Sequence, residues 1–150
     1  MDQVNAAQIL DALVTLKKKD TYCILGVTNK DLYPDDSYNF VFGLARLGGG
    51  TGVFSFVRYA PSFPGNKPSS NWIESACHTM AHEITHMFGL KHCIYYECLM
   101  NGVMSAEEAA RRPNHTLCPI CLKKLKINIK FDTAERFRLL MEACIELKLM

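Results

Sequence analysis

A pair of histidines in the middle of the chain constrains the fold more than any other feature. Residues 82–86 have the sequence HEITH, in which the two histidines lie four positions apart. On an α-helix, residues at this spacing share one face, so both imidazoles point in the same direction. An HExxH pattern on a helix is typical of a zinc site. The sequence therefore predicts a helix that begins after Ser70 or Asn71 and ends at Gly89.

A third metal ligand is predicted at His92. A catalytic zinc ion is typically held by three protein ligands and keeps one position open. If the helix continued, His92 would lie about 9 Å beyond His86 along the axis and could not share the ion. Gly89 removes this difficulty, because glycine adopts the left-handed conformation without steric cost and can end the helix. We expect His82, His86 and His92 to bind one zinc ion, with Gly89 as the hinge.

Glu83 is the predicted general base. Zinc lowers the pKa of a bound water toward ~7, but a neighbouring group must still accept the water's proton. The expected reaction is hydrolysis of a peptide bond, in which Glu83 passes this proton to the leaving amine. No side chain is assigned to the oxyanion.

Simpler interpretations of the histidines are less favoured. A bare HExxH also occurs by chance on ordinary amphipathic helices, and the correct offsets of Gly89 and His92 are what favour zinc. His78 lies on nearly the same stripe, but ~12 Å along the axis from His86, too far to complete the site. We interpret His78 as a residue that lines the cleft or lies at the surface, with the surface position favoured.

Four of the seven cysteines form two pairs with metal-ligand spacing. Cys93 and Cys98 enclose four residues, and Cys118 and Cys121 enclose two. Such paired thiolates are typical of a tetrahedral zinc site, and the alternative is four buried apolar thiols. Four thiolates leave no open position, so we expect this second zinc ion to be structural. Because Cys93 follows His92, ordering the thiolates should also restrict that histidine.

Length and composition favour one globular domain covering residues 1–150. The net charge is +2, with 49% hydrophobic and 21% charged residues, which excludes disordered and collagen-like chains. The apolar runs are shorter than the ~18 residues that cross a membrane, and no basic leader precedes them. We expect an intracellular protein of the cytoplasm or nucleus, because zinc explains an odd number of cysteines better than disulfides do.

The pattern of elements predicts an α/β layer fold, or α+β. Three strands are expected from aromatic and β-branched runs, the first of them buried on both faces: residues 21–27, 39–46 and 52–59. Segment 29–37 is predicted to be a surface loop, and a cysteine-rich loop is expected after the HExxH helix. The helices, besides the one that carries HExxH, are expected at residues 6–19 with Asn5 as cap, in a short segment from Ser105 to Pro113, and from Asp132 or Thr133 onward. Phe137, Leu140, Met141 and Cys144 share one face of the last helix.

The motifs taken together resemble the archaemetzincins, a family of metzincin zinc peptidases. The resemblance rests on about 40 residues, namely His82, Glu83, His86, Gly89, His92, Cys93, Cys98, Met100, Cys118 and Cys121. The segments VFGLAR and SFVRY also resemble the strands of this family. The resemblance implies a twisted mixed sheet, a zinc-binding helix packed on it, a four-cysteine knuckle loop, a C-terminal helix and two zinc ions per chain. It also implies that Met100 belongs to a Met-turn beneath the catalytic zinc; otherwise this methionine would be core filler.

One departure from the family pattern concerns the start of the chain. Metzincin sheets begin with a strand ahead of the first helix, and we predict that this strand is missing, so that the chain is a fragment or a shortened form. Peptides are the substrates that the resemblance implies, with cleavage by an aminopeptidase or of small peptides. Endopeptidase activity stays open.

The sequence also allows two non-catalytic alternatives. Lys123, Lys124, Lys126 and Lys130 could contact nucleic acid from a zinc-stabilised module. A near-neutral net charge and the lack of interleaved aromatic residues argue against it. A pseudo-peptidase that keeps zinc as a scaffold would have no use for Glu83. We therefore expect a monomer that acts on peptides and binds neither nucleic acid nor a membrane.

Overall fold

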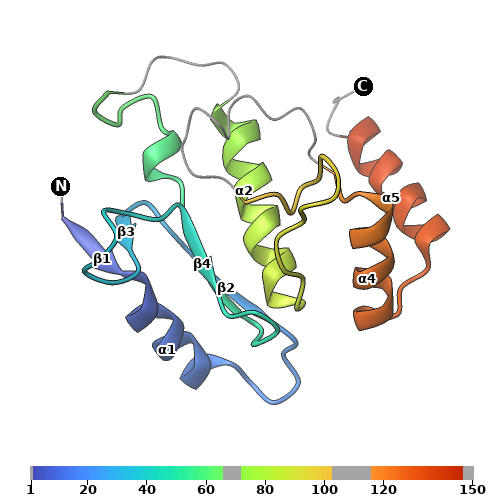
Figure 1. Cartoon of the computed structure of the whole chain (residues 1–150), viewed down its shortest axis with the longest axis horizontal. Helices are drawn as coiled ribbons and strands as arrows, with labels where there is room; N and C mark the ends of the chain where they lie inside the picture. Colours follow the sequence, from blue (N-terminus) through green and yellow to red (C-terminus); the bar gives the residue numbers. More distant parts are fainter. Residues whose placement is uncertain (1, 66–71, 103–115, 147–150) are drawn as a thin grey trace.

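A small sheet, a central helix and a pair of C-terminal helices make up the protein. The computed structural model describes residues 2–65, 72–102 and 116–146. Figure 1 shows the sheet and α1 (Ala6–Leu16) at one end, α2 (Trp72–Met87) in the middle, and α4 (Pro119–Ile129) and α5 (Thr133–Glu146) at the other end. The α/β class predicted from the sequence is confirmed.

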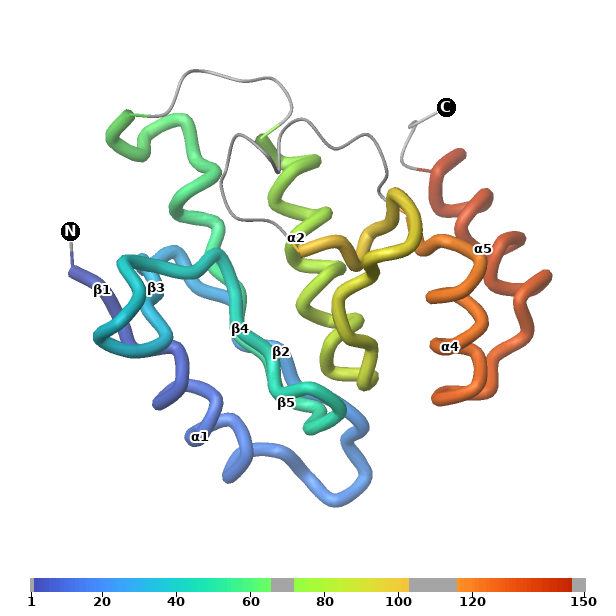
Figure 2. The backbone as a smooth tube through the Cα atoms, viewed as in Figure 1, coloured from blue at the N-terminus to red at the C-terminus, as the bar shows by residue number. Residues whose placement is uncertain are grey.

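Three strands form the main sheet in the order β2-β5-β4. The central strand is β5 (Thr51–Ser55), which is buried throughout and runs parallel to β2 (Ile24–Thr28) and antiparallel to β4 (Gly43–Ala45). β4 therefore lies at an edge of this sheet, and it packs beside α2 (Figure 2). The prediction that the first of these strands is buried on both faces is wrong, because Val27 is 54% exposed.

A separate pair of short parallel strands corrects two predictions. β1 (Gln3–Asn5) precedes the first helix and pairs with β3 (Asp31–Tyr33), so the first strand is not missing. Segment 29–37 is not merely a surface loop, because Asp31 and Leu32 are buried in β3. Strands of three residues are too short to show an alternating pattern, which is why sequence periodicity did not reveal them.

Several boundaries also differ from those predicted. The Asn5 side chain accepts a hydrogen bond from the Gln8 amide at 3.0 Å, as expected of the cap, but the helix ends at Leu16 rather than Lys19. The strand predicted over 39–46 is shortened to β4, with an isolated bridge from Val41 to β3. The one predicted over 52–59 ends at Ser55 and continues as the 3-10 helix η1 (Val57–Tyr59). The short helix predicted at 105–113 and the cap at residues 70–71 lie outside the described residues.

α4 was missed, because only a cysteine-rich loop and one short helix were expected between the HExxH helix and the last helix. Cys118 caps this helix by accepting a hydrogen bond from the Cys121 amide, and Pro119 occupies its first turn. Proline at that position was the available signal. The predicted start of the last helix is confirmed, since the Asp132 carboxylate accepts a hydrogen bond from the Glu135 amide at 2.8 Å.

Buried residues gather in three clusters on either side of α2. One lies between α1 and the sheet, one around Phe54 and Tyr59, and one around Met100 and the four cysteines. α2 is thus held between the sheet and the cysteine cluster, so its histidine face is fixed from both sides. In the part of the chain that is described, no helix has the length and apolar character that a membrane span requires.

Candidate metal centre and cleft

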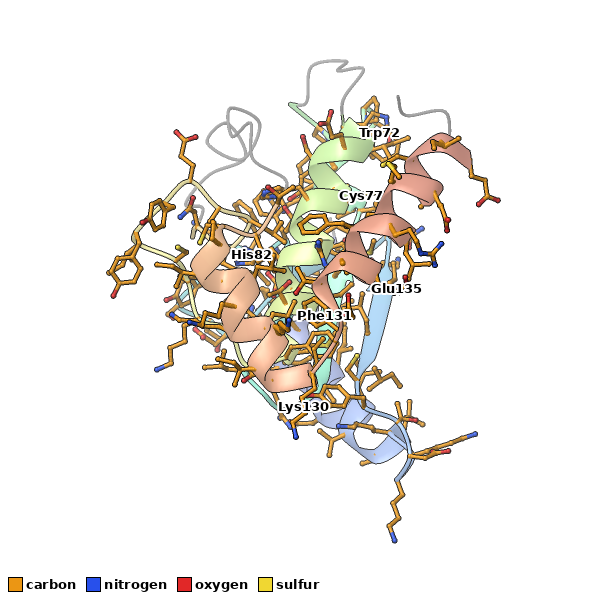
Figure 3. All side chains as sticks on the ribbon, turned by 90° about the vertical axis from the view of Figure 1, so that its right-hand side faces the viewer. Trp72, Cys77, His82, Lys130, Phe131 and Glu135 are labelled. Carbon is orange, nitrogen blue, oxygen red and sulfur yellow. The ribbon has the colours of Figure 1, made fainter. Side chains whose placement is uncertain are left out.

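The three predicted histidines come together at the end of α2. His82 and His86 project from the helix, and His92 from the segment that follows it. Their ring centroids are 4.5 to 5.2 Å apart, and one nitrogen of each lies within 4.8 Å of the others. Figure 3 looks onto α4 and α5 and labels His82 midway along α2. The Gly89 bend thus brings His92 back to the helix, as its spacing predicted.

Backbone carbonyls orient two of these imidazoles. His82 Nδ1 lies 2.7 Å from the Leu99 carbonyl oxygen, and His86 Nδ1 lies 2.6 Å from that of Leu90. Since a carbonyl can only accept, each Nδ1 carries the proton and each Nε2 keeps a free lone pair. Burial lowers the pKa of His82 to about 4 and also lowers the pKa of His86, so both rings are neutral. Neutral imidazoles with free Nε2 atoms form a donor set that fits zinc.

The turn after α2 depends on Gly89. Its φ of 88° lies in the left-handed region, which residues other than glycine rarely adopt. Two further residues that sequence reasoning missed stabilise this turn. The amide of Gly48 donates to the His86 carbonyl at 3.0 Å, and the Asn128 side chain of α4 donates to the Phe88 carbonyl at 2.8 Å. The turn is therefore held by the sheet side and by α4 together.

The four predicted cysteine ligands also converge. Their sulfur atoms lie within 4.8 Å of one another, and all four residues are buried. Backbone amides approach the sulfurs, with the Cys118 amide 3.2 Å from Cys98 Sγ. Burial raises the pKa of the Cys121 thiol. Burial also acts to raise the pKa of Cys93, but hydrogen bonds from the amides of Tyr95 and Tyr96 outweigh it and lower that pKa to about 7. Four clustered sulfurs with amide donors fit a tetrahedral zinc ion.

Asn101 holds the two ends of the cysteine segment together, and the sequence had not singled it out. Its amide nitrogen donates to the carbonyls of Cys93 and Tyr96 at 2.7 and 2.9 Å, and its oxygen accepts from the Cys98 amide at 2.8 Å. The preceding residue, Met100, is fully buried, and its carbonyl accepts from the Cys93 amide at 2.7 Å. The turn that would place Met100 beneath the ion is thus built into the cysteine segment.

A cavity of about 860 Å³ lies beside the three histidines. One wall is α2, and the other is the segment from Tyr38 to Leu47, which includes β4. Glu83 faces this cavity, and burial raises the pKa of its carboxyl to about 7. His78 lines the cavity and is 7% exposed, so the prediction of a surface position is wrong. Four residues upstream of His82 is one helical turn, which keeps His78 on the same buried face.

The comparisons with known proteins identify the family. The family model for peptidase family M54 matches residues 2–127. The chain is 42% identical over 164 residues to archaemetzincin-2 of Pongo abelii. The chain belongs to the archaemetzincin family. This match covers 92% of the chain but 45% of the relative, so the chain spans a little under half of that protein's length.

Solved archaemetzincin structures share the fold. The archaemetzincin of Methanopyrus kandleri superposes with a TM-score of 0.72 at 33% identity, over 86% of this chain and 67% of that one. A zinc-dependent peptidase from Methanocorpusculum labreanum superposes with a TM-score of 0.70 at 30% identity, over 82% and 74% of the two chains. The resemblance to archaemetzincins noted from the motifs is therefore confirmed.

Stability should fall as the pH is lowered from about 6.5 toward 4. An unfolded chain protonates His82 near pH 6.5, whereas burial lowers the pKa of His82 in the folded protein to about 4. The unfolded state binds more protons in this window, so the stabilisation is present above pH 6.5 and is lost below it. The free energy of unfolding of the metal-free protein should decrease by about 2 kcal/mol between roughly pH 7 and pH 5. Urea unfolding measures it, and His82→Gln should flatten the dependence; equal wild-type values at both pH values would contradict the expectation.

Proposed function

We propose that this archaemetzincin is a zinc-dependent peptidase. The observation that carries the proposal is that the rings of His82, His86 and His92 and the Glu83 carboxyl meet in one cleft. The same cleft is open to solvent along the edge strand β4, so an extended peptide can reach the histidines. The family match and the zinc-dependent relative of known structure support the assignment.

Glu83 is proposed to transfer the proton. Zinc held by His82, His86 and His92 would polarise a peptide carbonyl and make a water molecule nucleophilic near neutral pH. A carboxyl with a pKa of about 7 can accept a proton from water and then donate it to the leaving amine at neutral pH. A bound dication favours the ionised carboxylate, which is the form that begins this cycle.

A second, structural zinc ion is proposed at Cys93, Cys98, Cys118 and Cys121. Four buried sulfurs without a replaceable ligand suit a structural rather than a catalytic ion. Each chain would then bind two zinc ions. Thiolate ligands persist where thiols are kept reduced, which supports the proposal of an intracellular location.

Short peptides are the proposed substrates. The cavity accommodates a stretch of a few residues between β4 and α2, and its described lining is mostly apolar on the β4 side. Cleavage near the amino terminus and cleavage within a peptide are distinguished by the products formed from a random peptide library. Release of single amino-terminal residues would support an aminopeptidase, and internal fragments would refute it.

Replacement of Glu83 by glutamine should remove hydrolysis and keep the metal. The amide has the size of the carboxyl but cannot take the proton, so kcat is expected to fall by roughly 10²-fold to 10⁴-fold. Hydrolysis of a peptide mixture and zinc content are measured together. Glu74→Gln changes an exposed carboxylate on the same helix outside the cleft and is the matched control. Equal activities of the wild type and Glu83→Gln would sink the catalytic proposal.

Replacement of Gly43 by alanine should displace Glu83. A Cβ at this position of β4 would lie 2.7 Å from Glu83 Cγ and 2.9 Å from the Val53 carbonyl oxygen, so the side chain or the strand must shift. A misplacement of about 1 Å costs on the order of 10² in kcat, while the histidines keep their ion. Gly26→Ala, whose Cβ would meet the flexible end of Leu13 at 3.2 Å, is the control within the same sheet. An unchanged kcat in Gly43→Ala would argue against this placement of Glu83.

Replacement of Cys118 by alanine should impair folding and the retention of both ions. Removing one thiolate loosens the segment that carries the Leu99 carbonyl. Because this carbonyl orients the His82 ring, the ring would then lose its fixed direction. Zinc per chain and the melting temperature are the measurements, and Cys77→Ala, an exposed cysteine of α2 outside the cluster, is the control. A Cys118→Ala protein with two zinc ions and full thermal stability would refute the coupling.

A further inference from the structure

A buried ion pair between Asp31 and Arg58 holds side chains that extend to the cleft. Arg58 of η1 donates from Nε and Nη2 to the two carboxylate oxygens of Asp31, at 2.6 and 2.7 Å. Asp31 is 3% exposed. Burial by itself would raise the pKa of Asp31, but hydrogen bonds from Arg58 and Gln3, and the charge of Arg58, hold it below its usual value. The pair is therefore ionised at neutral pH and fixed in a two-pronged geometry.

The Arg58 guanidinium also lies over an aromatic ring of the cleft wall. Its central carbon is 3.5 Å from the centroid of Phe40 and 5.0 Å from that of Phe63. A cation at this distance from an aromatic face is attracted to it. Asp31 fixes the guanidinium and the guanidinium fixes the Phe40 ring, so the orientation of this ring depends on a carboxylate that does not line the cavity.

The backbone next to Phe40 is held from the same place. Gln3 Nε2 donates both to Asp31 at 3.0 Å and to the Asn39 carbonyl at 2.8 Å. Asn39 and Phe40 belong to no strand, and they line the cavity opposite α2. One carboxylate thus holds the ring of this wall through Arg58 and its backbone through Gln3.

The wall continues from Phe40 to the helix that carries Glu83. The Phe40 ring meets Phe42 edge-on at 5.3 Å between centroids, and Phe42 packs on Tyr59 at 4.9 Å. The Tyr59 hydroxyl donates to Thr79 Oγ1 at 2.6 Å, and Thr79 lies on α2 one turn before Glu83. The Tyr59–Thr79 hydrogen bond therefore anchors this end of the wall on α2.

We propose that the Asp31–Arg58 ion pair is a positioning element for substrate recognition, which holds the Asn39–Phe42 wall in the conformation that receives an apolar side chain of the peptide. The proposal rests on the proposed peptidase function and adds the residues that determine substrate affinity. Asp31 and Arg58 would act through the wall, so they should affect the binding of side chains and leave the proton transfer by Glu83 unchanged.

Arg58→Lys tests the proposal, because lysine keeps the charge but loses both the two-pronged contact and the flat face over Phe40. Zinc-loaded protein is titrated calorimetrically with acetohydroxamate, a bare zinc ligand, and with phenylalanine hydroxamate, which adds an aromatic side chain. The affinity ratio of the two ligands is expected to fall about five-fold in Arg58→Lys, while acetohydroxamate binds as in the wild type. In hydrolysis of a peptide with an apolar residue, KM should rise by a similar factor with kcat unchanged.

Two further variants make the result decisive. Phe40→Leu leaves the ion pair intact and removes the ring, so it should lower the same ratio even if Arg58→Lys folds poorly. Arg138→Lys alters another arginine that contacts carboxylates, those of Glu135 and Glu142 on the exposed helix α5, and should change nothing. A merely structural role would lower kcat through loss of folded protein and leave KM and the affinity ratio unchanged.

The outcomes separate this proposal from the proposed function. Unchanged ratios and KM values in folded Arg58→Lys and Phe40→Leu overturn the positioning role while leaving the peptidase intact. Absence of acetohydroxamate binding to the zinc-loaded wild type overturns the histidine site, and the positioning role falls with it. Reduced ratios in a protein that hydrolyses no peptide support the positioning role and overturn the catalytic one.

Discussion

Two hydrogen bonds from imidazole nitrogens to backbone carbonyls determine how the rest of the site works. The carbonyls of Leu99 and Leu90 accept from Nδ1 of His82 and His86, and both lie beyond the end of α2. The helix sets the spacing of these imidazoles, but the segments that follow set their tautomer and direction. A change that moves those segments therefore alters how the His82 and His86 rings are oriented, even though both residues stay in place on the helix.

The cysteine cluster and the histidine site share these segments. Leu99 lies between Cys98 and Met100, and Asn101 joins the same turn to the carbonyls of Cys93 and Tyr96. Ordering four sulfurs about an ion would hold this turn rigid without placing a ligand in the cleft. The proximity of His92 and Cys93 in sequence suggested such coupling, and the contacts of Leu99 and Asn101 supply its physical route.

On the opposite side of α2, the cleft wall is irregular where it meets the cavity. β4 contributes three residues, and backbone hydrogen bonds hold Val41 to Leu32 and Phe42 to Ser55, whereas Asn39 and Phe40 are held by side chains. A wall of this kind needs anchoring, because unpaired backbone carries more conformational freedom than a strand. Asp31, Arg58 and Gln3 provide that anchoring from β1, β3 and η1, three short elements that lie together at the sheet end of the molecule (Figure 1).

The sequence by itself determined which side chains could bind metal, because ligand spacing on a helix and in paired knuckles is a local property. HExxH, Gly89, His92 and the four cysteines needed no long-range information, and the cap at Asn5 was equally local. Only the tertiary structure decided the burial of His78, the pairing of β1 with β3, the helix α4 after the cysteine-rich loop, and the roles of Asn101, Asn128 and Arg58. Those features arise from contacts between segments tens of residues apart, and a hydrogen-bond partner that is distant in sequence leaves no periodic signal in either segment.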